Sequence, residues 1–216
     1  MNIGVLGTGT VGQTIASRLV ELGHAVTMGA RQAGNENATA WAAAHHGRAG
    51  TFADAAAYGA IVLNCTNGVG TLDALAAAGE ANLAGKVLID VSNPLDFSAG
   101  FPPTLSVANT DSLAERIQAA YPATKVVKSL NTVTASVMVR PDRVPGDHVV
   151  FVAGEDADAK EITRGLLGEF GWPEGRVLDL GGIRAARGLE MYLPLWLSLY
   201  GAVGTGEFNI AVHTAM

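Results

Sequence analysis

The stretch "VLGTGTVGQTIASRLVELG" at residues 5–23 decides the fold. It places Gly7, Gly9 and Gly12 in G-x-G-x-x-G spacing, directly after a β-branched run and at the start of a helical pattern. In dinucleotide-binding βαβ units the first glycine allows a tight turn, the second lets the backbone approach a pyrophosphate, and the third packs the helix against the strand. The alternative is a purely structural glycine turn. The residues predicted to hold a pyrophosphate are Gly7, Thr8, Gly9, Thr10, Val11 and Gly12.

The pattern after the glycines continues the βαβ prediction. Apolar side chains fall on one stripe of the predicted helix, at Val11, Ile15, Leu19 and Leu22, and Gly23 is expected to end it in the left-handed conformation. Further short apolar runs alternate with Ala-rich or amphipathic segments, which is typical of a parallel sheet covered on both faces. The runs lie at residues 2–6, 25–28, 60–65, 86–91 and 125–130.

The rest of the chain is expected to form helices at 35–47, 71–83, 156–170 and 183–200, strands at 147–154 and 176–180, a possible last strand at 207–212, and a long loop at 91–112. The sequence therefore predicts an α/β protein with a Rossmann-type, doubly wound, mainly parallel sheet and a small C-terminal lobe. We expect a dinucleotide-binding domain at 1–145 and an α/β extension at 146–216 that does not fold alone.

Composition narrows the class of protein. The chain has 216 residues, a formal net charge of −6 and a pI near 5.3, so it lacks the basic character of nucleic-acid-binding proteins. Cys65 is the single cysteine, and its apolar surroundings predict a small buried residue in a reducing compartment. The N-terminus has no leader pattern, and the apolar stretch 189–203 is too short to span a membrane. We expect a cytoplasmic protein with no membrane partner.

The loop after the second predicted strand indicates the type of dinucleotide. No acidic residue stands between Glu21 and Glu36, where NAD-binding proteins often have one for the ribose hydroxyls, whereas Arg31 follows the strand directly. A planar guanidinium suits a 2′-phosphate, and Gln32 can add a neutral donor. The loop favours NADP(H), with a surface arginine in an NAD-binding protein as the alternative.

Polar residues gather where three predicted strands end. In an open α/β sheet these carboxyl ends line the ligand crevice, although Asn, Thr and Pro also end strands for purely local reasons. Neutral side chains there can hold phosphate, ribose and carboxamide groups. The further residues predicted to bind the cofactor are Asn64, Thr66, Asn67, Asn93, Pro94, Asn131, Thr132 and Ala135.

The same loops lack a histidine that could act as a proton donor. Lys128 is the nearest alternative, but a lysine in a strand is more often at an edge, and Asp90 and Asp96 are expected to be exposed loop carboxylates. The pair His45 and His46 cannot both face one metal ion on a helix. We therefore predict no catalytic acid or base and no metal ligand.

Hydride transfer to a large conjugated ring fits such a site, because the ring itself delocalises the charge. One wall of a flat pocket could come from the late apolar helix, which would serve equally well as core or as a dimer contact. The residues concerned are Met191, Tyr192, Leu195, Trp196 and Leu199.

Taken together, the glycine segment, "NCTNG", "VLIDVSNPLDF", "KVVKSLNTVTASVM" and "GGIRAARGLEMYLPLWLSL" resemble the NADPH-dependent reductases of coenzyme F-420, an 8-hydroxy-5-deazaflavin. The resemblance implies a homodimer that passes hydride between NADPH and the deazaflavin, with the 2′-phosphate at Arg31 and the nicotinamide beside residues 131–135. Ala30 and Asn35 stand where the family often has a hydroxyl and a basic residue, which leaves selectivity for NADP to Arg31.

Two other functions stay open at this point. One is NADPH-dependent reduction of a flavin, carbonyl or imine; the imine reductase type is disfavoured because only about 60 residues follow the strand at 147–154. The other is a non-catalytic protein that senses NADP.

Overall fold

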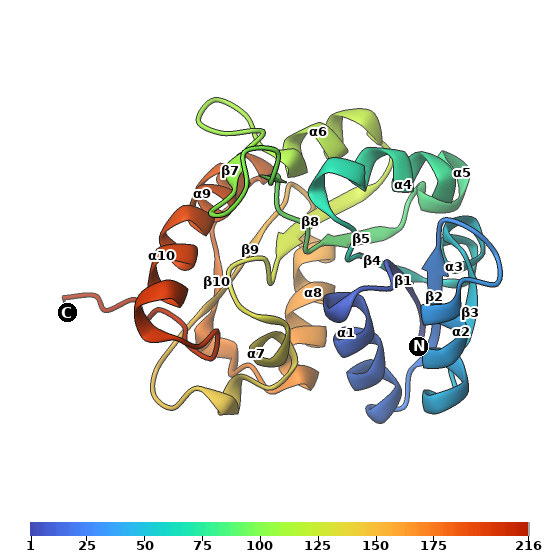
Figure 1. Cartoon of the computed structure of the whole chain (residues 1–216), viewed down its shortest axis with the longest axis horizontal. Helices are drawn as coiled ribbons and strands as arrows, with labels where there is room; N and C mark the ends of the chain where they lie inside the picture. The colour runs from blue at the N-terminus through green and yellow to red at the C-terminus, as the bar shows by residue number, and fades with distance from the viewer. Residues whose placement is uncertain (216) are drawn as a thin grey trace.

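A single eight-stranded sheet organises the chain in the computed structural model, which describes residues 1–215. The strand order is β10-β9-β8-β5-β4-β1-β2-β3, and all neighbours are parallel except β8 and β9 (Figure 1). The strands are β1 (Asn2–Leu6), β2 (Ala25–Ala30), β3 (Arg48–Thr51), β4 (Ile61–Asn64), β5 (Val87–Asp90), β8 (Lys125–Ser129), β9 (Val150–Ala153) and β10 (Val177–Asp179). The predicted Rossmann-type, mainly parallel α/β fold is confirmed.

Helices cover both faces of this sheet (Figure 1). One face carries α1 (Thr10–Glu21), α2 (Glu36–His45), α7 (Ala135–Val139) and α8 (Ala157–Phe170). The other carries α3 (Phe52–Tyr58), α4 (Thr71–Ala78), α5 (Glu80–Leu83), α6 (Leu113–Ala120) and α9 (Ala186–Met191). Successive strand residues alternate between the two apolar cores, which is why these strands read as unbroken apolar runs.

The order of the central strands positions a ligand crevice. β1 pairs with β2 on one side and with β4 on the other, so the chain reverses its direction of travel across the sheet at β1. The carboxyl ends of β1, β4, β5 and β8 therefore meet at one edge, where α/β proteins bind their ligands. The first crossover is as predicted: Ile15 and Leu19 are buried, and Gly23 has a φ of 87°.

The structure corrects several predicted elements. β3 and α3 were not predicted, because four small or polar residues and a short Ala-rich helix carry little periodic signal. The predicted helix 71–83 divides at Gly79, whose φ of 88° ends α4 before α5 begins. The loop 91–112 contains a small hairpin of β6 (Leu95–Asp96) and β7 (Thr104–Leu105).

The C-terminal predictions were partly wrong. The expected helix 183–200 consists of a 3₁₀ turn at Ile183–Ala185, α9, and a separate helix α10 (Leu193–Val203) that begins around Pro194. Residues 207–212 form no strand: they make one backbone hydrogen bond near the sheet, from the amide of Val149, the residue before β9, to the Ile210 carbonyl. Within the described residues, no helix combines the length and the apolar character needed to cross a membrane.

Candidate functional site

The glycine loop joins β1 to α1 at the centre of the sheet edge. A Cβ atom at Gly7 would lie 2.6 Å from the Cys65 carbonyl oxygen, and one at Gly12 would lie 2.2 Å from the Gly7 carbonyl oxygen. Backbone packing therefore requires these two glycines. Gly9 differs, since a Cβ there would meet nothing within 4 Å and its φ is −79°. The space beside Gly9 is therefore open, as the predicted approach of a pyrophosphate would require.

The first turn of α1 is suited to an anion. Gly9 is the N-cap and offers no side-chain cap, and the first turn has no acidic residue. The leading amides of a helix have no partner within it and form its positive end. The Gln13 side-chain amide donates to the Thr8 carbonyl at 2.8 Å and so holds the loop that leads into the helix.

Arg31 stands just beyond β2, as predicted, and its side chain is exposed. It forms no ion pair with any residue that the structure describes. It lines a hollow together with Thr66, Asn67 and Asp73, whereas Gln32 lies outside the lining. Asp73 was not predicted, because α4 brings this acid into the hollow from 42 positions further along the chain (73 − 31).

A second hollow continues from the first and shares Thr66 and Asn67 with it. Val11, Asn93 and the half-exposed ring of Phe97 line it, so it extends from the start of α1 to the loop after β5. Pro94 is buried beside it, and its carbonyl accepts hydrogen bonds from the amide and hydroxyl of Ser106. Pro94 thus anchors the β6–β7 hairpin rather than lining the hollow.

Asn64 has a different role from the predicted one. Its side chain is fully buried. The Asn64 amide nitrogen donates to Asp90 Oδ1 at 2.7 Å, and Asn64 Oδ1 accepts from the Thr66 hydroxyl at 2.6 Å. The side chain is therefore not available to a cofactor. It holds Thr66, which does line both hollows.

The loop after β8 is fixed by a pair of asparagines. Asn93 donates to the Asn131 carbonyl at 2.9 Å, and Asn131 donates to Asn93 Oδ1 at 2.9 Å and to the Leu189 carbonyl at 3.1 Å. Leu130, just before Asn131, has the left-handed conformation with a φ of 63°. This conformation is uncommon for a bulky residue, and such residues cluster at functional sites.

Two atoms of this loop have no partner. Asn131 Oδ1 and Thr132 Oγ1 are buried without a hydrogen bond within the described chain. Such atoms are rare in proteins unless a ligand or water completes them. Ala135, also predicted to bind the cofactor, is the first residue of α7 and is partly exposed. The loop fits a polar group such as a carboxamide.

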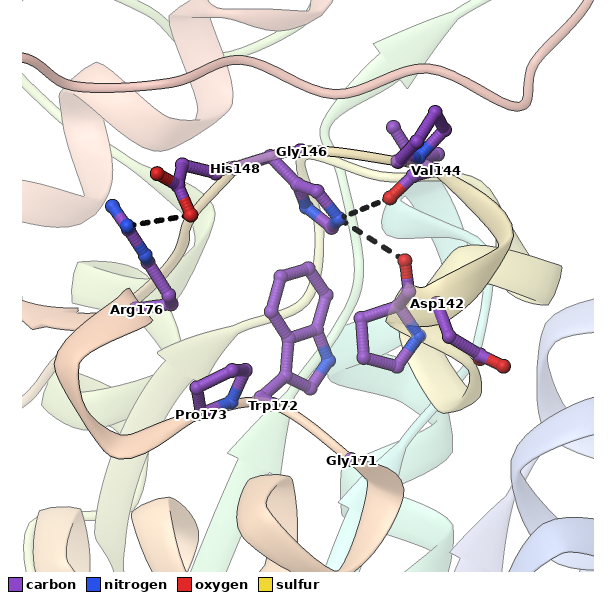
Figure 2. A pocket seen from close by; sticks show the side chains of 11 residues that line it. Asp142, Val144, Gly146, His148, Gly171, Trp172, Pro173 and Arg176 are labelled. Atoms are coloured by element: carbon purple, nitrogen blue, oxygen red, sulfur yellow. Dashed lines mark hydrogen bonds and ion pairs between the residues drawn. The ribbon is translucent and has the colours of Figure 1, made fainter.

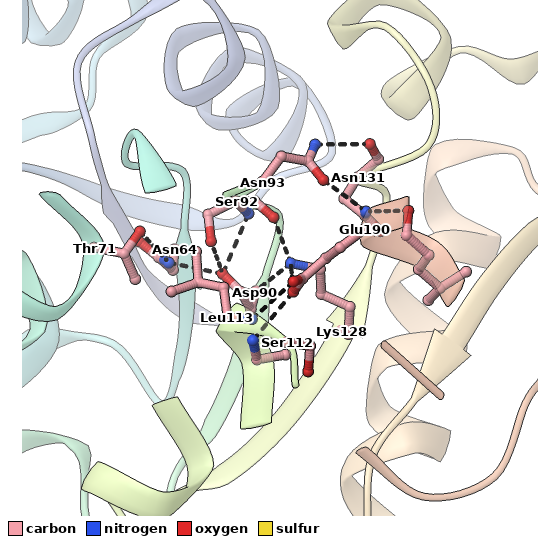
Figure 3. Close-up of polar contacts among 12 residues, drawn as sticks. Asn64, Thr71, Asp90, Ser92, Asn93, Ser112, Leu113, Lys128, Asn131 and Glu190 are labelled. Atoms are coloured by element: carbon pink, nitrogen blue, oxygen red, sulfur yellow. Dashed lines mark hydrogen bonds and ion pairs between the residues drawn. The ribbon is translucent and has the colours of Figure 1, made fainter. Parts of the chain in front are cut away.

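Lys128 and Asp90 were predicted wrongly, as Figure 3 shows. Both side chains are fully buried, because β8 and β5 are central strands and the apolar cover of α6 and α9 lies over them. The Lys128 ammonium contacts Asp90 Oδ2 at 2.8 Å, Glu190 Oε1 at 3.0 Å and the Ser92 carbonyl. Burial alone would lower the pKa of Lys128, but the two carboxylates outweigh it and raise this pKa above its ordinary value. Lys128 is therefore a fixed cation and not a proton donor.

The helices α9 and α10 present an aromatic group to the same region. The ring of Trp196 stacks on Tyr200 and Phe208, with centroids 5.5 and 5.3 Å away. Trp196 Nε1 and the Tyr192 hydroxyl are buried without partners in the described chain, and burial raises the pKa of Tyr192. A Cβ at Gly206 would lie 3.3 Å from Thr134 Oγ1 and 3.6 Å from Trp196, so the tail runs between these two side chains.

α10 is not the buried helix that was one expectation for this stretch. Leu193 is its only buried residue, while Leu195 and Tyr200 are 55% and 44% exposed.

Cys65 lies against the glycine loop, where it lines the second hollow and is partly exposed. Burial of its thiol, with a contribution from Asp90, raises its pKa far above the ordinary value.

A separate hollow lies between residues 141–148 and 171–176 (Figure 2). His148 Nε2 lies 3.0 Å from the carbonyls of Pro141 and Val144, and Arg176 pairs with Asp147 at 2.7 Å. No buried side-chain nitrogen or oxygen of its lining lacks a partner within the described chain. None of the predicted cofactor residues lines it, and we assign it no ligand.

Comparison with known proteins decides between the families that share this fold. The model of the family described as NADP oxidoreductase, coenzyme F420-dependent, matches residues 2–94. The crystal structure of a provisionally named F420-dependent NADP-reductase from Arthrobacter sp. FB24 is 51% identical, with a TM-score of 0.94, over 99% of this chain and 100% of that one. The chain belongs to this family. As a family member it is an NADP-dependent oxidoreductase, which confirms the prediction from sequence.

More distant similarities extend beyond this family. The rat metalloreductase STEAP3 is 28% identical over 198 residues, which cover 90% of this chain but only 37% of that protein. The chain thus spans little more than a third of this curated relative. A reductive aminase from Aspergillus terreus shares the fold, with 20% identity and a TM-score of 0.65 over 94% of this chain and 62% of its own.

Proposed function

We propose that this family member transfers hydride between NADPH and the deazaflavin coenzyme F-420. The observation that carries the proposal is the chemistry of the crevice. The side chains that line the hollows at the strand ends, Thr66, Asn67 and Asn93, are neutral, and the Lys128 ammonium behind them is held by three oxygens. The strand ends supply no proton donor of the kind that a carbonyl reductase needs, and burial raises the pKa of the Tyr192 hydroxyl, which makes it a weaker acid. A conjugated ring can accept hydride and spread the charge itself.

NADP would lie along the two hollows that share Thr66 and Asn67. In this proposal the amides at the start of α1 hold the pyrophosphate and Arg31 holds the 2′-phosphate. Asn131 Oδ1 and Thr132 Oγ1 would accept hydrogen bonds from the nicotinamide carboxamide, which completes two otherwise unpartnered atoms. The residues proposed to contact the cofactor directly are Gly7, Thr8, Gly9, Thr10, Val11, Gly12, Arg31, Thr66, Asn67, Asn93, Asn131, Thr132 and Ala135.

The acceptor would lie between residues 131–135 and the aromatic group of α9 and α10. Tyr192 and Trp196 supply two buried donors without partners, which suit carbonyl oxygens on the edge of a flat heteroaromatic ring. In this arrangement the chain contributes orientation and exclusion of water. The 51% identical relative, whose name contains the same cofactor pair, supports this assignment.

We also propose that two copies associate through the exposed apolar side chains of α10. Leu195, Tyr200 and Val203 are 55%, 44% and 56% exposed, which is unusual for a patch of large side chains on one helix. Sedimentation analysis tests this part: a dimer that Leu195→Glu converts to a monomer supports it, and a wild-type monomer refutes it.

Turnover decides the main proposal. Purified protein is mixed with NADPH and oxidised F-420, and the deazaflavin absorbance is followed, with FMN and a cyclic imine as parallel acceptors. Loss of the deazaflavin absorbance at a rate well above that of FMN or imine reduction supports the proposal. Tight binding of NADPH without reduction of F-420 would refute it, and turnover of another acceptor would identify the alternative.

A further inference from the structure

The buried cation at Lys128 links the segments that surround the crevice. Its ammonium contacts three oxygens from three places in the fold: Asp90 at the end of β5, the Ser92 carbonyl in the following loop, and Glu190 on α9. Figure 3 shows these contacts converging on one nitrogen. All three ammonium hydrogens are therefore used, and the side chain has no exposed surface.

Each of these partners holds a segment of the proposed site. Asp90 Oδ1 accepts from Asn64 and from the Ser92 amide and hydroxyl, and Asn64 in turn holds Thr66. Ser92 precedes Asn93, the partner of Asn131. The contacts of Lys128 thus reach Thr66 through Asp90 and Asn64, and they reach Asn93 through Ser92.

Glu190 carries the link into the C-terminal helices. Its carboxylate accepts hydrogen bonds from the amides of Leu113 and Ala114 at 2.7 and 3.1 Å, at the start of α6, while Oε1 also contacts Lys128. The preceding residue, Leu189, accepts the hydrogen bond of Asn131. α9 is therefore tied to the cofactor loops at two consecutive residues, just before Tyr192.

We propose that Lys128 is a positioning residue for hydride transfer: it sets the distance between the nicotinamide loop and the acceptor wall of α9 and α10. Buried ion pairs give little net stability compared with well-packed apolar residues, so a network of this kind is better explained by the geometry that it fixes. The proposal rests on the proposed function in placing the acceptor against α9 and α10.

Lys128→Met tests this role, with Lys125→Met as a matched control. Lys125 lies three positions earlier on the same strand, and its ion pair with Asp156 is solvent-exposed. In Lys128→Met we expect the NADPH dissociation constant to change less than about 3-fold, because the α1 amides and Arg31 are untouched. We expect the single-turnover rate of hydride transfer to fall about 10-fold or more, since misplacement of reacting groups costs about this much or more.

Two further readouts separate positioning from a loss of folded protein. The primary isotope effect with NADPH deuterated at the transferred position should increase in Lys128→Met, and the amides of residues 186–192 should exchange hydrogen at least about 10-fold faster. Loss of folded protein alone would lower the single-turnover amplitude and the amount of bound NADPH in equal proportion, and it would leave the rate constant and the isotope effect unchanged.

Glu190→Gln keeps the proposal testable if Lys128→Met does not fold. This change leaves the Lys128–Asp90 pair in place and weakens the contacts of Glu190 with Lys128 and with the Leu113 and Ala114 amides, so the same changes are expected in smaller measure. Unchanged transfer rate and exchange in a folded variant, or parallel loss in Lys125→Met, would overturn the proposal. If the wild-type protein does not reduce F-420, the proposed function fails, and the exchange of residues 186–192 still decides whether Lys128 fixes α9.

Discussion

Replacing Arg31 by alanine is expected to weaken NADPH binding by about 10- to 150-fold and to leave NADH binding within about 2-fold. Arg31 is exposed and makes no ion pair in the part of the chain that the structure describes, so its loss leaves no unpaired partner. Stability should therefore change by no more than about 0.5 kcal/mol. A charge-assisted hydrogen bond contributes about 1.5–3 kcal/mol, which corresponds to the stated range of affinity.

Asp73 provides the opposite perturbation in the same hollow. Its carboxylate would repel a 2′-phosphate across a solvated gap, so Asp73→Asn should strengthen NADPH binding by about 2- to 5-fold, in line with the roughly 0.2–1 kcal/mol typical of exposed charge pairs. Arg31→Lys keeps the charge but not the planar fork and should fall between wild type and Arg31→Ala.

The assay is a titration of protein fluorescence with NADPH and with NADH at two salt concentrations. The effect of Arg31→Ala should shrink at high salt, because exposed charges are screened. Equal weakening of both dinucleotides, at either salt concentration, would refute the assignment of Arg31 to the 2′-phosphate.

Two other pairs of measurements test the loop and the fold. Gly12→Ala should lower the Tm by about 2–12 °C, because overpacking against the Gly7 carbonyl costs about 1–3 kcal/mol and each kcal/mol lowers the Tm by about 2–4 °C. Gly9→Ala should leave the Tm unchanged and weaken the binding of NADPH. Equal Tm values for the two variants would contradict this prediction. The hydrogen bond from Arg187 is the main cause that lowers the pKa of Glu115 in the folded protein. The pair therefore stabilises the fold at a pH above the pKa that Glu115 has in the unfolded chain, and this stabilisation is lost as the pH falls through the lower pKa of the folded state. Urea unfolding should therefore show Arg187→Met less stable than wild type near pH 7, with a difference that shrinks as the pH falls through the folded pKa of Glu115. A difference that persists in acid would refute the pairing.

Local signals made the cofactor half of the fold predictable. The glycine spacing, the stripe on α1 and the position of Arg31 depend on residues within about one βα unit of each other. The structure places these residues as expected from that spacing. β3 was missed for the complementary reason, because "RAGT" has no apolar alternation and its pairing with β2 decides its conformation.

Distant partners explain the errors at the site. Lys128 was expected at an edge, but its carboxylate partners stand 38 positions before it and 62 after it (128 − 90 and 190 − 128). Nothing in the sequence around Lys128 indicates this pairing. For residues 207–212 a local signal was misleading, because their alternating apolar pattern predicted a strand. In the structure this segment makes one backbone hydrogen bond, to Val149 just before β9.

Cys65 has a practical consequence for experiments on this chain. Thiol labelling depends on the thiolate, and the raised pKa of Cys65 leaves very little thiolate near neutral pH. A cysteine introduced on the exposed surface, for example at Val203, would therefore react with maleimide dyes much faster than the native one. The wild-type sequence already serves as a labelling background, so α10 can carry a single dye without altering the residue that packs against Gly12.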